Sequence, residues 1–132
     1  MTTALKHLQW ALQALASPAE VQLRLHPPFV SILDELVLDF DCWFHVAASE
    51  TEFTLEQQAA LSALEKCIVE WSGPPHADVW MEAALKSHPV WFDFRMLAAE
   101  ALVALGWPVE HPPIDPAVRG TTFLQASFDP AR

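Results

Sequence analysis

The stretch "LDELVLDFDCWFHV", residues 33–46, decides the fold because its large apolar side chains recur at helical spacing. At 100° per residue, the apolar side chains from Phe29 to Phe44 fall within an arc of about 140°, which is typical of a helix with one buried face. We therefore predict a long helix over residues 29–47, with its polar side chains on the opposite face.

Four further segments have the same spacing, and several of their ends carry recognisable signals. The sequence predicts helices over about 4–16, 54–73, 78–86 and 89–106. Thr3 and Asp78 are expected to cap the first and third of these, and Thr54 with Gln57 has the spacing of a capping box. Pro89 and Gly106 suit the first turn and the end of the last helix. Because the apolar arc of that helix is wide, we expect it to be central.

Two irregular segments complete the chain. "SPAE" at residues 17–20 predicts a short helix start with Ser17 as its cap. Residues 107–132 hold five of the eleven prolines and have no helical period. We predict an all-α, single-domain bundle of about five helices over residues 1–106, with residues 107–132 as a proline-rich tail packed across it.

The composition limits the environment and the class of protein. The chain is 52% hydrophobic, so it should fold, yet it has no apolar run long enough to span a membrane. Two cysteines are too few for a disulfide framework, which favours a cytoplasmic protein. A single bridge between Cys42 and Cys67 stays open.

The net charge of −10 is concentrated in one part of the chain. Residues 25–65 contain eight acidic residues and no Lys or Arg, whereas the remainder has nine acidic residues against seven basic ones. This acidity would repel nucleic acids and anionic membranes, so we expect neither as a partner.

A metal site is one interpretation of the acidic helix. Asp34, Asp41 and His45 share one ridge of it. However, Asp34 and Asp41 are two turns apart, too far to hold one ion without an inward-facing partner, and the chain lacks the Glu-x-x-His spacing of helical di-metal sites. We therefore expect no metal or other cofactor, and expect His45 to pair with Asp41.

Catalysis is a second interpretation, because Cys42 and His45 are three residues apart. The negative charge of Asp39 and Asp41 disfavours the reactive thiolate. The sequence also has no G-x-S-x-G, no H-E-x-x-H and no glycine-rich phosphate loop. We predict that the protein is not an enzyme, and keep a small Cys/His/Asp enzyme as an alternative.

Binding of a basic protein explains more of the pattern. Asp34 and Asp41 form one row on the outer face, Glu35 and Asp39 form a second, and apolar residues lie between them. Charged rows would steer a basic partner in, and an apolar centre would hold it. The predicted partner-binding residues are Asp34, Glu35, Leu38, Asp39, Asp41, Cys42, His45, Glu50, Glu52 and Glu56.

A second surface lies on the predicted helix 89–106, where Phe92, Met96 and Val103 project away from the buried stripe. We expect the tail or another helix to cover them. If they are exposed, the alternative function is a structural or regulatory homodimer subunit that self-associates through this face.

The sequence thus predicts a non-catalytic acidic module that binds, and neutralises, a basic protein such as a toxin or nuclease. In size, acidity and lack of enzymatic motifs the chain resembles small bacterial immunity or antitoxin proteins. The likeness is one of general character, and no residue role is taken from it.

Overall fold

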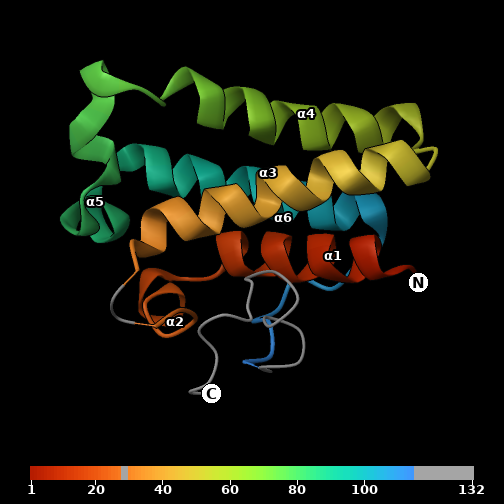
Figure 1. Ribbon diagram of the computed structural model, residues 1–132, viewed down its shortest axis with the longest axis horizontal. Helices are drawn as coiled ribbons and strands as arrows, with labels where there is room; N and C mark the ends of the chain where they lie inside the picture. Colours follow the sequence, from red (N-terminus) through yellow and green to blue (C-terminus); the bar gives the residue numbers. More distant parts are fainter. Residues whose placement is uncertain (28–29, 115–132) are drawn as a thin grey trace.

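Four long helices run lengthwise along the molecule in the computed structural model, which describes residues 1–27 and 30–114 (Figure 1). The described residues contain no strand, so the predicted all-α class is confirmed. The elements are α1 (Thr3–Ala16), α2 (Ala19–Gln22), α3 (Ile32–Glu50), α4 (Leu55–Glu70), the 3-10 helix η1 (Pro74–Trp80), α5 (Glu82–Ser87) and α6 (Pro89–Leu105). No helix in these ranges is long and apolar enough to cross a membrane.

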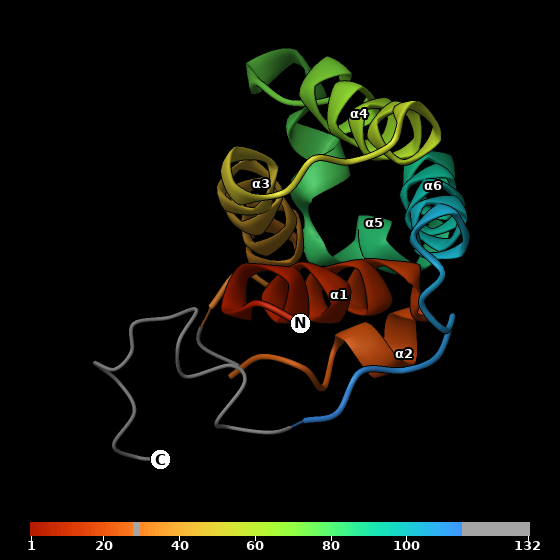
Figure 2. The ribbon, with the colours of Figure 1, turned by 90° about the vertical axis from the view of Figure 1, so that its right-hand side faces the viewer.

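The four long helices surround one apolar core. α1 packs against α3 on one side and α6 on the other, while α4 packs on α6 and touches α3 at few positions (Figure 2). The largest fully buried side chains come from several of these helices, among them Leu12, Phe40, Leu64, Trp91 and Phe94. α3 and α4 pair loosely, and the exposed side chains Leu38 and Val69 lie where the two helices face each other, which matters for the candidate site.

The predicted ends of α6 are confirmed. Pro89 occupies the first turn, and the ring of His88 caps the helix by accepting a hydrogen bond from the backbone N–H of Val90. Gly106 ends the helix with a φ of 75°, the left-handed conformation that glycine adopts most easily.

The capping box of α4 is also confirmed, but the one predicted for residues 17–20 is wrong. Thr54 and Gln57 exchange both side-chain-to-backbone bonds, at 3.0 and 3.1 Å. Ser17 instead ends α1, where its hydroxyl donates to the carbonyl oxygen of Gln13. α2 therefore begins without a side-chain cap.

The turn after α4 differs from the prediction. The helix stops at Glu70, and Gly73, with a φ of 103°, leads into η1. Asp78 lies inside η1 and does not cap α5, because Met81 occupies the N-cap position. Two indole N–H groups fix this turn on the bundle. Trp91 donates to the carbonyl of Val79, and Trp80 donates to that of Trp71, each at 2.9 Å.

Arg95 of α6 connects three parts of the fold. Its guanidinium donates to the carbonyl oxygen of Ser17, to the side-chain oxygen of Gln22 and to the carbonyl oxygen of Leu85. Burial lowers the pKa of this guanidinium, and the carboxylate of Glu20 partly offsets the effect. The hydrogen bonds of Arg95 therefore hold α5 and the corner between α1 and α2 against α6.

The proline-rich tail lies across α1 as far as the structure describes it. Gln13 and Trp10 donate side-chain hydrogen bonds to the carbonyls of Pro108 and Pro113, at 3.1 and 2.7 Å. The packing predicted for the tail is thus seen up to residue 114, and the rest of the tail lies outside the described residues.

Candidate functional site: the groove between α3 and α4

One ridge of α3 carries the exposed part of the predicted site. Asp34, Leu38, Asp41 and His45 follow one another at steps of four, three and four residues, and all four are exposed. Such steps keep side chains on one face of a helix. Leu38 is 58% exposed despite its apolar side chain, and Cys42 lies exposed at the edge of the ridge.

The predicted second acidic row is wrong. Asp39 is buried, with its carboxylate 3.9 Å from the ring of His26, and Glu35 is half-buried. Asp39 lies on the buried face of α3 because α1 and the segment that contains His26 cover that side of the helix. The ring of His7, for example, stacks on Trp43 with centroids 4.4 Å apart. Asp39 is thus unavailable to a partner.

α4 supplies the opposite wall of a shallow groove. Figure 1 shows α4 running back along the bundle beside α3. One cavity of about 190 Å³ lies between α3 and α4, and a second of about 270 Å³ lies between α3 and the turn that follows α4. The two cavities adjoin, because they share the lining residues Val37, Leu38 and Ser72. We call this the α3–α4 groove. Its apolar lining includes Val37, Leu38, Ile68 and Val69, and its acidic residues are Asp34, Asp41 and Glu65.

His45 joins the two walls of the groove. Its Nε2 atom lies 3.3 Å from Asp41 Oδ1, so the expected His45–Asp41 pair is present, and 2.5 Å from Glu65 Oε2. The hydrogen bond to Glu65 raises the pKa of His45, and the negative charges of both carboxylates add to the effect although desolvation opposes it. The imidazole therefore favours its protonated form more than a free histidine does.

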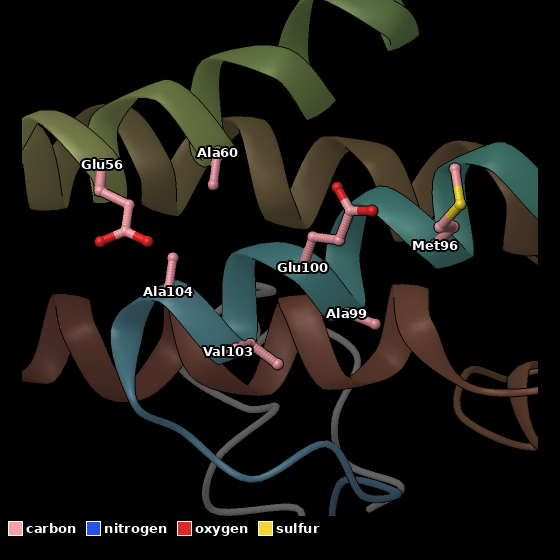
Figure 3. Close-up of a pocket in the computed structure, with 7 residues that line it drawn as sticks. All are labelled: Glu56, Ala60, Met96, Ala99, Glu100, Val103 and Ala104. Carbon is pink, nitrogen blue, oxygen red and sulfur yellow. The ribbon is translucent and has the colours of Figure 1, made fainter.

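The three remaining acids of the predicted site lie elsewhere. Glu50 ends α3, Glu52 lies in the following loop, and both are exposed. Glu56 belongs to a different hollow, between α4 and α6 (Figure 3). The structure therefore does not bring these three acids together with the exposed ridge of α3 in one patch.

The α4–α6 hollow has a volume of about 550 Å³. Figure 3 shows Glu56 extending from α4 and Glu100 from α6, with Met96 and Val103 beside them. Met96 and Val103 are 53% and 70% exposed, and Phe92 on the same helix is 56% exposed. The expectation that the tail or another helix covers them is wrong for the described residues, because the tail up to residue 114 lies across α1.

The cysteines are not bridged. Cys42 and Cys67 are both free. Burial raises the pKa of the Cys67 thiol, and the charges of Asp93 and Glu70 raise it further. A raised pKa reduces the fraction of thiolate, the nucleophilic form of cysteine.

Sequence reasoning missed the α4 side of the groove, namely Glu65, Val69 and Ser72. A signal was present, since Glu65 and Val69 directly follow the buried positions Leu64 and Ile68, and Ser72 comes three residues after Val69. That spacing places them on one flank of the helix. The packing of α4 decides which helix this flank faces, and the local sequence pattern does not predict that packing.

No known protein-family model, curated protein or solved structure matches this chain.

Proposed function

We propose that the chain is a non-catalytic binding module whose α3–α4 groove receives a basic segment of a protein partner. The observation that carries this proposal is the combination of exposed Leu38 and Val69 with a border of Asp34, Asp41 and Glu65. Apolar residues at the centre of a polar border are the usual anatomy of a protein interface.

The charge defines the chemistry of the partner. The region from residue 25 to 65 has no Lys or Arg, so the one basic side chain of α3 is His45, which pairs with Asp41 and Glu65. Lys or Arg side chains of the partner would meet the carboxylates, and an aliphatic or aromatic side chain would lie between Leu38 and Val69. The carboxylates accelerate association, and the apolar contact slows dissociation.

Such a complex would cover the basic surface of the partner. A cationic toxin or nuclease needs its positive surface to reach nucleic acid, because phosphate contacts supply much of that affinity. A protein that occupies this surface neutralises the activity without chemistry of its own. The proposed role is therefore of the immunity or antitoxin type.

The test compares three immobilised proteins as baits for a lysate of the source organism. The groove variant carries Asp34→Asn and Asp41→Asn, and the control carries Glu82→Gln and Glu110→Gln, exposed acids outside the groove. Both variants lose two negative charges. We expect the wild type and the control to retain the same basic protein, released as salt shortens the Debye length from about 10 Å at 0.1 M to about 3 Å at 1 M.

The groove variant should release that protein at clearly lower salt. A further variant, Leu38→Ser with Val69→Ser, leaves the charge unchanged and should weaken retention through loss of the apolar contact. Equal retention by the groove variant and the control would show that the acids act only through net charge. Retention of no protein by the wild type at low salt would also contradict the proposal.

A homodimer formed through α6 is the second candidate function, favoured by the exposure of Phe92, Met96 and Val103. The net charge of −10 and the acids of the α4–α6 hollow oppose self-association. Sedimentation equilibrium separates the two functions. A monomer over the micromolar range argues against the dimer, whereas a dimer that Val103→Glu dissociates would support it.

A further inference from the structure

The side chains of Asp41, His45 and Glu65 converge at one point between α3 and α4. One ligand atom from each lies within 4.8 Å of the other two. Two carboxylates from different helices approach the same imidazole nitrogen, at 3.3 and 2.5 Å. Among residues 1–27 and 30–114, this is the one group of at least three His, Cys, Asp or Glu side chains so arranged.

We propose that Asp41, His45 and Glu65 bind a divalent transition-metal ion of the Zn²⁺ type. Zn²⁺ bonds to imidazole nitrogen and carboxylate oxygen at about 2.0–2.2 Å, so tetrahedral ligand atoms lie roughly 3.3–3.5 Å apart. The His45–Asp41 distance already fits, and His45 and Glu65 must separate by about 1 Å. Partial exposure of all three side chains leaves them room to rotate, and water would occupy the fourth position.

The donor set selects the class of ion. A histidine nitrogen among the ligands favours Zn²⁺, Ni²⁺ or Cu²⁺, whereas Mg²⁺ and Ca²⁺ prefer oxygen ligands alone. Displacing the imidazole proton by an ion of charge +2 would also neutralise the two carboxylates beside it.

On sequence alone, the ligands on the helix 29–47 lack an inward-facing partner. Glu65 is that partner, and it comes from a different helix, 20 residues after His45. The proposal goes beyond the proposed function because it requires no protein partner. The two share Asp41 and Glu65, so their tests use different ligands.

A metal here would connect two helices that otherwise touch at few positions. Since an ion that binds only the folded state stabilises it by mass action, the midpoint of thermal unfolding should rise with the concentration of Zn²⁺. In the metal-free protein, His45 of α3 pairs directly with Glu65 of α4, and the ion would replace this pair by two metal–ligand bonds that join the same helices.

The experiment is calorimetric titration of EDTA-stripped protein with ZnCl₂, together with thermal unfolding at several Zn²⁺ concentrations. We expect one ion per chain in the wild type, and affinity lower by at least about tenfold in His45→Gln and in Glu65→Gln. Two matched controls, Asp34→Asn on the same ridge and Cys42→Ser beside the cluster, should bind as the wild type does. MgCl₂ should give no comparable binding.

Cobalt provides a second readout that reports ligand geometry. Co²⁺ in the site should show visible absorption of tetrahedral intensity, which His45→Gln abolishes. Circular dichroism confirms that each variant is folded. Absence of Zn²⁺ binding by the wild type, or unchanged affinity in folded His45→Gln, would overturn the proposal and leave His45 as an ion-pair partner of the two carboxylates.

Discussion

The Nε2 atom of His45 on α3 lies 2.5 Å from the Oε2 atom of Glu65 on α4. This bond raises the pKa of His45 above its ordinary value of 6.5. A raised pKa in the folded state stabilises the fold fully below about pH 6.5, and this contribution is lost as the pH rises through the pKa of the folded state.

We therefore expect the His45 ring resonances to titrate above pH 6.5 in metal-free buffer containing EDTA, as measured by NMR. Glu65→Gln should lower the midpoint, whereas Asp34→Asn should leave it nearly unchanged. The stability difference between wild type and Glu65→Gln should shrink as the pH rises, and should stay below about 1 kcal/mol because His45 is exposed. A midpoint that does not respond to Glu65→Gln would contradict the bond.

Asp39 should respond to charge reversal quite differently from Asp34. Asp39→Lys places a cation in a buried site beside His26, and should lower the free energy of unfolding by about 3–5 kcal/mol. Asp34→Lys, on the exposed ridge, changes only the interaction of this side chain with the N-terminal end of the α3 dipole and should cost about 1 kcal/mol. Urea denaturation followed by circular dichroism measures both. Equal effects would place Asp39 at the surface. Because Asp39 is buried, binding tests on the acidic face should leave it unchanged.

Trp91 and Phe92 are neighbours in sequence with opposite environments. Trp91 is fully buried and donates to the carbonyl of Val79, so Trp91→Ala should cost about 3–5 kcal/mol of folding free energy. Phe92→Ala should cost little, because the ring is 56% exposed. Thermal or urea unfolding of the two variants gives the comparison, and similar costs would mean that α6 is rotated from its described orientation.

The capping box predicts a modest and specific effect at Thr54. Thr54→Ala removes the oxygen that accepts the Gln57 N–H, and should cost about 1 kcal/mol. Thr54→Ser retains that oxygen and should recover most of the loss. If both substitutions cost the same, the effect would come from the methyl group of Thr54 and not from the cap.

Features that depend on neighbouring residues in the sequence were predictable. The start of α4 follows from Thr54 and Gln57, and both ends of α6 follow from Pro89 and Gly106. In each case the signal is a backbone preference or a hydrogen bond within a few residues, so the surrounding fold is not needed to interpret it.

Features set by packing were not predictable. On a helical wheel Asp39 lies only 20° from Ile32, at the edge of the apolar arc, and burial of that edge depends on the segment containing His26. The sequence that begins at Ser17 is typical of a helix start, but Ser17 ends α1 instead. Glu65 is one of the eight acidic residues between residues 25 and 65, but its contact with His45 could not be predicted. That contact depends on the antiparallel alignment of α3 and α4, which local spacing does not encode.

Arg95 has a consequence for the order in which the chain can fold. Its acceptors at Ser17 and Gln22 precede it by 78 and 73 residues, and Gln13 and Trp10 on α1 bond to carbonyls 95 and 103 residues further on. During synthesis on the ribosome, α1 therefore emerges long before the groups that complete its polar contacts exist. α3 can cover one side of α1 early, but the side of α1 that packs on α6 stays uncovered until α6 follows, so the bundle closes late.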